Sequence, residues 1–98
     1  MFYAAAKSYV SSITRSMAKE YAADGIRVNG VAPGVITTPI HDRFTPPAVL
    51  GQLAAAVPMQ RLGVADDVAG TILYLASPAL SGYVTGEMVE VNGGLWMG

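Results

Sequence analysis

The sequence predicts an α/β fold, in the form of part of a doubly wound parallel sheet. Two short β-branched segments, Ile26–Val31 and Glu87–Val91, are typical of buried strands. Amphipathic or apolar segments of helical length precede and separate them, and glycine or proline marks their ends. Strands separated by helices pair in parallel through right-handed crossovers. Because parallel sheets are covered on both faces and have more than two strands, we expect a piece of a larger sheet.

The first predicted helix runs from Tyr3 to Ala23. Apolar residues recur along it at spacings of three and four, which places them on one face. Gly25 is its stop signal, because glycine readily takes the left-handed conformation that follows many helices. The predicted apolar stripe consists of Ala6, Val10, Ile13, Met17 and Tyr21.

Proline and glycine divide the rest of the chain into shorter elements. Pro33-Gly34 is expected to end the first strand, and a proline stands directly after each later helix. Two aspartates in the first turn of the third helix complement the helix dipole. The expected elements are a loop over Val35–Pro47, a helix over Pro47–Val57, a connector over Arg61–Gly63, a helix over Asp66–Ser77 and a turn over Asn92–Gly94.

The composition is unusual for a chain of 98 residues, which is long enough for one small domain. Apolar residues make up 52% and charged residues only 13%, against roughly 25% charged residues in an ordinary soluble domain. Small domains have the most surface per unit volume and should be more polar than average. We therefore expect much of this surface to be covered by a partner or by another part of the same fold.

Several classes of function are disfavoured. The longest apolar stretch, near Val68–Ala76, is about half of the roughly 20 residues needed to cross a bilayer, and no signal peptide is visible. The absence of cysteine excludes disulfides, thiolate metal sites and a cysteine nucleophile. A net charge of −1 carries no signature of nucleic-acid binding. We expect a cytoplasmic protein that binds neither membrane nor nucleic acid and holds no metal.

Tyr3 and Lys7 are the first candidate catalytic pair. Residues four apart share one face of a helix. A free phenol has a pKa near 10, and a nearby ammonium lowers it, which makes tyrosine a usable general acid or base. Spacing alone favours the plainer interpretation of a solvated lysine stacked on a tyrosine at the helix start.

The wider pattern resembles the short-chain dehydrogenase/reductase family. YAAAK, GIRVN, VAPG, PGVITT, RLG, DDVA, LASP, YVTGE and VNGG follow one another in the family's order and spacing over essentially the whole chain. The resemblance implies a Rossmann-like fold. It also implies that residues 1–98 are a partial domain without the N-terminal dinucleotide-binding half, including its TGxxxGxG turn and the catalytic serine and asparagine. The segments PMQRLG and VEVNGGLWMG look most like 3-oxoacyl-[acyl-carrier-protein] reductases.

The resemblance assigns roles to six residues. Tyr3 would exchange a proton with the substrate oxygen, and Lys7 would hydrogen-bond the nicotinamide ribose and lower the pKa of Tyr3. The cofactor would be NAD or NADP, a choice made by the absent half. The substrate would be a small carbonyl compound or secondary alcohol, fitted by the loop from residue 39 to 57. The expected cofactor-binding residues are Tyr3, Lys7, Pro33, Gly34, Ile36 and Thr38, with the Ile36 backbone meeting the carboxamide.

Other residues have plainer interpretations. Pro33-Gly34 could merely end a strand, and Thr38 could merely form a turn. Asn29 is expected to tie neighbouring backbone groups together, and His41 to be a surface group. By the resemblance, the first helix and the C-terminal Trp96 and Met97 would serve subunit interfaces of a homodimer or homotetramer.

Two readings of function stay open. The first is the C-terminal part of an NAD(P)-dependent oxidoreductase, inactive as a lone chain. The second is an inert truncated remnant that docks onto homologous full-length subunits. A small independent interaction domain is disfavoured by the low charge and the two-stranded sheet.

Overall fold

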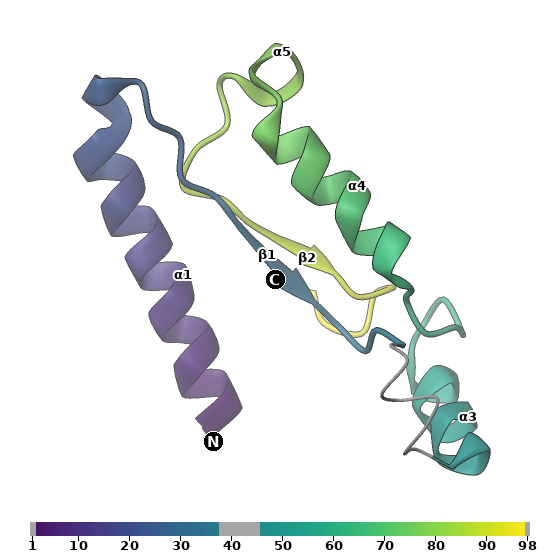
Figure 1. Ribbon diagram of the computed structural model, residues 1–98. Coiled ribbons are helices and arrows are strands. Elements are labelled where there is room, and N and C mark those ends of the chain that lie inside the picture. The colour runs from purple at the N-terminus through teal and green to yellow at the C-terminus, as the bar shows by residue number, and fades with distance from the viewer. Residues whose placement is uncertain (1, 38–45, 98) are drawn as a thin grey trace. The chain divides into compact units, whose positions relative to one another are not determined.

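The computed structural model describes residues 2–37 and 46–97 (Figure 1). The chain divides into two compact units: Met1–Val31 with Leu73–Val89, and Ala32–Ile72 with Glu90–Gly98. Strands β1 (Gly30–Pro33) and β2 (Met88–Val91) pair in one two-stranded sheet, and each strand contributes residues to both units. Gly30 N–H bonds the Glu87 carbonyl and Gly34 N–H bonds the Val91 carbonyl, so the strands run in parallel. The predicted α/β class is confirmed.

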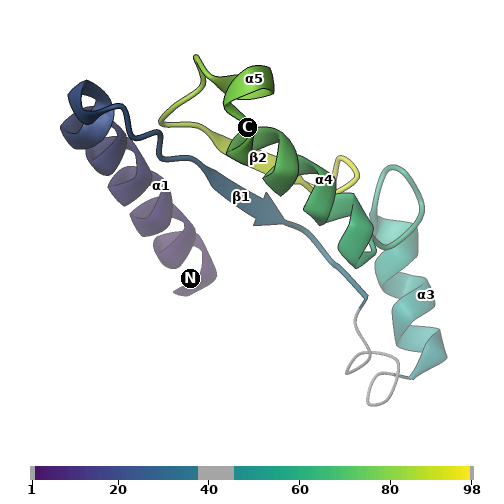
Figure 2. The same ribbon diagram turned by 45° about the horizontal axis from the view of Figure 1, so that its top comes forward.

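The first unit begins with helix α1 (Phe2–Tyr21), which is uninterrupted from both viewpoints (Figures 1 and 2). The 3-10 turn η1 (Ala22–Asp24) follows and ends at Gly25 with a φ of 76°. This left-handed residue is the predicted stop, and its N–H bonds the Ala22 carbonyl at 3.1 Å.

The buried face of α1 differs from the predicted stripe. Its most buried side chains are Thr14 and Ala18, whereas Val10, Ile13 and Met17 are 39–48% exposed. The reason is the close approach of glycine: a Cβ on Gly86 would lie 3.4 Å from Ala18 Cβ. Small side chains fit such a contact, and the Thr14 hydroxyl is satisfied by the Val10 carbonyl at 2.7 Å.

Strand β1 starts four residues later than predicted. The Asn29 side chain occupies the place of ladder hydrogen bonds: its amide donates to the Val84 carbonyl at 3.0 Å, and its oxygen accepts from Glu87 N–H at 3.0 Å. Thr85 similarly accepts from Val28 N–H through its hydroxyl. Regular pairing therefore begins at Gly30, and the expected structural role of Asn29 is confirmed.

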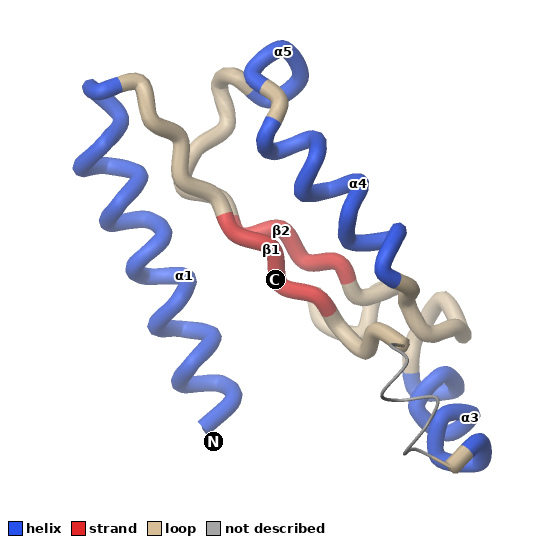
Figure 3. The backbone as a smooth tube through the Cα atoms, viewed as in Figure 1, coloured by secondary structure: helices blue, strands red, loops and turns tan. Residues whose placement is uncertain are grey.

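Helix α4 (Ala65–Ala76) is followed by a short helix, α5 (Pro78–Ser81), that the sequence analysis missed (Figure 3). Pro78 ends α4 as predicted, but proline is also well suited to the first position of a helix. Ser81 is 2% exposed, with its hydroxyl 2.7 Å from the Tyr74 carbonyl. Arg27 donates to the Ser81 carbonyl at 2.9 Å, which ties α5 to the segment before β1.

The second unit contains α3 (Pro47–Ala56), the first two turns of α4 and the turn after β2. The turn is the predicted one, with Gly93 and Gly94 at φ values of 63° and 92°. Gly94 N–H bonds the Asn92 side chain at 3.0 Å. A Cβ on Gly93 would lie 2.7 Å from a methyl group of Val57, so glycine allows the turn to pack on the end of α3.

The apolar core within residues 2–37 and 46–97 is small. The buried hydrophobic side chains are Ala18, Val57 and Leu75. Much larger groups are exposed, including Leu73 at 70% and Trp96 at 63%. No helix in this described part is both long and apolar enough to cross a bilayer.

Candidate functional site

The predicted site residues fall in both units. Tyr3 and Lys7 lie one turn apart on α1, in the first unit, and the helix puts them on the same face. The Tyr3 side chain lies outside the described part, and Lys7 is half-buried. Pro33, Gly34 and Ile36 lie in the second unit. Thr38, like His41, lies outside the described residues.

Gly34 sits where the ends of the two strands approach most closely. Its N–H bonds the Val91 carbonyl at 2.9 Å. A Cβ at this position would lie 2.6 Å from Asn92 Cβ and 2.9 Å from Asn92 Cα. Pro33, the last residue of β1, is exposed beside it. The Pro-Gly pair thus ends the strand as predicted, and the glycine also permits this contact.

The segment after Gly34 makes a bridge that the sequence analysis did not predict. Ile36 and Gly63 form an isolated parallel β-bridge. Gly63 N–H donates to the Val35 carbonyl at 3.0 Å, and the Gly63 carbonyl accepts from Thr37 N–H at 2.8 Å and from the Thr37 hydroxyl at 3.2 Å. Neither the N–H nor the C=O of Ile36 takes part. Because successive residues of a strand direct these groups to opposite sides, both point away from Gly63.

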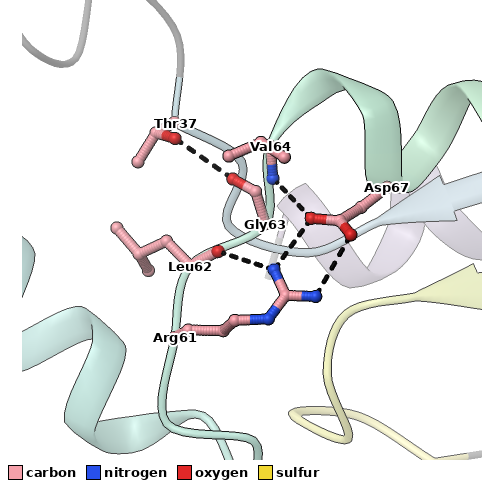
Figure 4. A network of polar contacts seen from close by, with 6 residues as sticks. All are labelled: Thr37, Arg61, Leu62, Gly63, Val64 and Asp67. Carbon is pink, nitrogen blue, oxygen red and sulfur yellow. Dashed lines mark hydrogen bonds and ion pairs between the residues drawn. The ribbon is translucent and has the colours of Figure 1, made fainter.

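An ion pair anchors the turn that carries Gly63 (Figure 4). Arg61 holds Asp67 through two parallel hydrogen bonds of 2.9 and 3.1 Å, a bidentate arrangement that fixes the guanidinium plane. Asp67 also accepts from Val64 N–H at 2.7 Å, which is how an acidic residue in the first turn caps a helix. Arg61 donates further to the Leu62 carbonyl at 3.3 Å.

Electrostatics at this pair favour both charged forms. The hydrogen bonds from Arg61, followed by the Val64 N–H, lower the pKa of Asp67 to about 2. The Asp67 carboxylate in turn raises the pKa of Arg61 above its ordinary value. The pair is half open to solvent, since the Arg61 side chain is 53% exposed and that of Asp67 is 30% exposed.

A cavity of about 290 Å³ lies beside the bridge, wholly within the second unit. It is formed by the bridge, the ion pair and the turn after β2, and Glu90 contributes a further carboxylate. Among the described residues there is no group of three or more His, Cys, Asp or Glu side chains that could hold a metal ion. The main wall residues are Ile36, Arg61, Gly63, Asp67, Asn92 and Gly93.

Arg61, Gly63 and Asp67 are residues of interest that sequence reasoning did not select. The two aspartates of the first turn of α4 were expected to complement the helix dipole alone. The available signal was the third helical position of Asp67, from which a carboxylate reaches back to the turn before the helix. Nothing in the sequence near Thr37 or Gly63 indicated that these two residues, 26 positions apart, would be hydrogen-bonded.

Comparison with known proteins places this geometry in a family. The family model described as enoyl-(acyl carrier protein) reductase matches residues 1–96. A (3R)-3-hydroxyacyl-CoA dehydrogenase from Canis lupus familiaris is 46% identical over 95 residues, which cover 97% of this chain and 36% of that protein.

Solved structures agree. A 3-oxoacyl-[acyl-carrier protein] reductase from Brucella melitensis matches with a TM-score of 0.88 and 42% identity, covering 98% of this chain and 35% of that one. A further Brucella melitensis reductase of this name, with bound NAD, matches with a TM-score of 0.83 and 42% identity over 98% of this chain and 34% of its own. The chain thus spans about a third of the length of these relatives and corresponds to the C-terminal part of their Rossmann-like fold. It belongs to the short-chain dehydrogenase/reductase family of oxidoreductases.

Proposed function

We propose that residues 1–98 form the Tyr–Lys and nicotinamide-facing part of an NAD(P)-dependent oxidoreductase that interconverts a carbonyl and a secondary alcohol. They are the C-terminal part of one domain, and the dinucleotide-binding half comes from outside these residues. The observation that carries the proposal is the Ile36 backbone, held beyond the end of β1 with its N–H and C=O directed away from Gly63. Open α/β sheets bind their ligands at the carboxyl ends of the strands.

The residues present suit a nicotinamide cofactor. A carboxamide offers an acceptor oxygen and a donor NH₂ group, which match the N–H and C=O of Ile36 respectively. The absence of a side chain at Gly34 lets the end of β1 pack closely against Asn92, two residues before the Ile36 backbone. When bound, the cofactor would supply or accept the hydride. Thr38 would hydrogen-bond the carboxamide or the pyrophosphate, and Pro33 would form part of the pocket wall.

Tyr3 would be the general acid and base of the reaction. In the reducing direction its phenol gives a proton to the carbonyl oxygen as the carbonyl carbon gains a hydride, and in the oxidising direction the phenolate takes the alcohol proton back. Lys7, one turn further along α1, would stabilise the phenolate and lower its pKa. A positioned general acid or base contributes about 10²–10⁴-fold to rate.

The relatives suggest a substrate and a cofactor to test first. Their names specify a 3-hydroxyacyl or a 3-oxoacyl group carried on CoA or on acyl carrier protein, and one solved relative holds NAD. We propose a 3-oxoacyl thioester as the substrate class. NAD and NADP are both to be tested, because the adenosine site lies outside these residues.

The second candidate function is an inert subunit-docking piece. It is favoured by the exposed apolar side of α1, where Val10 and Ile13 are 48% and 41% exposed, and by the 80% exposure of Met97. On this reading the chain associates with homologous subunits in the cytoplasm and does no chemistry. The homo-oligomer expected for the family would use the same surfaces.

Complementation separates the two functions. The chain would be fused to the dinucleotide-binding half of a 3-oxoacyl-[acyl-carrier protein] reductase and assayed with a 3-oxoacyl thioester and NADH or NADPH, by loss of reduced-cofactor fluorescence. We expect turnover by the fusion and none by the lone chain, and Tyr3→Phe should reduce kcat at least 10²-fold. Tyr9→Phe is the matched control, since Tyr9 is 66% exposed on the same helix. A fusion that binds cofactor without turnover would favour the docking piece.

A further inference from the structure

The turn before α4 is fixed from both sides. Upstream, Arg61 is locked in plane by its two bonds to Asp67. Downstream, the same carboxylate accepts from Val64 N–H at 2.7 Å. Asp67 belongs to the first turn of a 12-residue helix, so its carboxylate is attached to a rigid element. Gly63 lies between Arg61 and Val64, so the bonds that these two residues make to Asp67 also restrict where Gly63 can lie.

Gly63 passes this restraint to the segment that carries Ile36. Its N–H and C=O hold Val35 and Thr37, the neighbours of Ile36 on either side. At the near end, Gly34 N–H is held by the Val91 carbonyl at 2.9 Å. The Ile36 segment is therefore restrained at two places, by Val91 through Gly34 and by Gly63 through Val35 and Thr37. The second restraint depends on the position of Gly63.

Packing adds a steric element to the bridge. A Cβ on Gly63 would lie 2.5 Å from Ile36 Cδ1, so the isoleucine side chain rests directly on the glycine. The side chain and the backbone bridge thus set the rotation of the Ile36 segment together. Its remaining N–H and C=O are directed to the opposite side.

We propose that Arg61 and Asp67 are positioning residues, which act through Gly63 to hold the Ile36 backbone edge where it can bind a planar amide such as the nicotinamide carboxamide. The identity of the amide rests on the proposed function, whereas the mechanical link from the ion pair to Ile36 does not. The RLG segment (Arg61–Gly63) and the DDVA segment (Asp66–Ala69) thus share one role, and we call the Arg61–Asp67 pair together with Gly63 the clamp.

Direct binding of an anionic group by Arg61 is the alternative role for an arginine at a cavity. The guanidinium already donates twice to a carboxylate and once to the Leu62 carbonyl. A phosphate bound here would also lie close to the Asp67 carboxylate, whose negative charge on the same wall would repel it. The geometry therefore favours the positioning role.

Amide hydrogen exchange of the full chain, followed by NMR, tests the mechanical link without any cofactor. Asp67→Asn and Arg61→Gln should each raise the exchange rates of the Thr37 and Gly63 amides roughly tenfold, since loss of a charge-assisted hydrogen bond lowers the free energy needed to open the bonds that protect these amides. The Gly30 and Gly34 amides, held by the strand ladder, should change less than about twofold. Equal acceleration at all four amides, or uniformly fast exchange in the unsubstituted chain, would overturn the clamp.

The same variants in the fused enzyme test what the clamp holds. We expect kcat to fall roughly tenfold with NADH in Asp67→Asn and Arg61→Gln, no further loss in the double variant, and partial rescue by Arg61→Lys. With the 3-acetylpyridine analogue of the cofactor, which has no amide donor, the fall in kcat should be markedly smaller.

Two outcomes would contradict parts of this proposal. If Arg61 binds an anion directly, Asp67→Asn would leave the KM of the acyl thioester unchanged or lower it while Arg61→Gln raises it, and the positioning role would be rejected. Normal turnover in all variants together with selective exchange at Thr37 would keep the clamp and reject the carboxamide role of Ile36.

Discussion

Replacing Gly34 with alanine tests the close contact at the ends of the two strands. The new Cβ would lie 2.6 Å from Asn92 Cβ and 2.9 Å from Asn92 Cα. Both distances are far inside the usual carbon–carbon separation of about 3.5–4.0 Å. The Asn92 Cα belongs to the backbone, so no rotation of a side chain relieves the overlap. One strand end has to move.

The expected cost follows from this geometry. Forcing extra carbon into a tightly packed site costs about 1–3 kcal/mol when the backbone has to shift. The shift would also threaten the bond from residue 34 N–H to the Val91 carbonyl, whose net contribution is about 0.5–1.5 kcal/mol. We therefore expect Gly34→Ala to lower the free energy of unfolding by about 2–4 kcal/mol in total.

Urea denaturation followed by circular dichroism measures this change, and Gly51 provides the matched control. Gly51 lies inside α3, and a Cβ there would meet nothing within 4 Å. Alanine is favoured over glycine within helices by about 0.5–1 kcal/mol, so Gly51→Ala should be neutral or stabilising. Both variants should have the unfolding slope of the unsubstituted chain. If Gly34→Ala were as stable as Gly51→Ala, the close contact between the strand ends would be refuted.

Two further predictions concern polar groups. The carboxyl of Asp67 should titrate near pH 2 by NMR and move toward the ordinary value of about 3.9 in Arg61→Gln. Because this pKa is lowered by folding, its contribution to stability should be complete above about pH 4 and be lost as the pH falls toward 2, and a pH-independent stability over that range would contradict the pairing. Asn29→Ala should reduce the free energy of unfolding by about 1–3 kcal/mol, since it leaves Glu87 N–H and the Val84 carbonyl without their side-chain partner. Asn29→Asp retains the acceptor and should lose less, and equal losses in the two variants would count against the bond to Glu87.

Local chain chemistry predicted most of the elements correctly. Gly25 ends the first helical segment, Pro33-Gly34 ends β1, and Asn92 to Gly94 form the turn after β2. Each of these depends on a glycine or proline whose backbone preference is local. The errors arose where a side chain or a distant segment competes with the backbone pattern. Asn29 replaces ladder bonds and so delays β1, and Pro78 both ends one helix and begins another.

The candidate site could be predicted only in part, for a related reason. Periodicity places Tyr3 and Lys7 on one helical face, and the Pro-Gly break marks the end of a strand. The hold on Ile36 comes from Gly63, 27 positions further along the chain, and nothing near either residue indicates that they meet. Asp67 looked like a dipole-complementing residue because its partner, Arg61, lies outside the helix.

Helix α1 shows why the apolar composition and the small core are consistent. Its side facing the strands carries Thr14 and Ala18, because glycines approach there and leave no room for larger groups. The large apolar side chains therefore occupy another side, where Ile13 and Met17 remain about 40% exposed. Hydrophobic side chains at helical spacing stabilise a fold only where another part of the structure removes them from water. In this chain the periodic stripe on α1 stays exposed, and the contact with the glycines is made by the small residues Thr14 and Ala18.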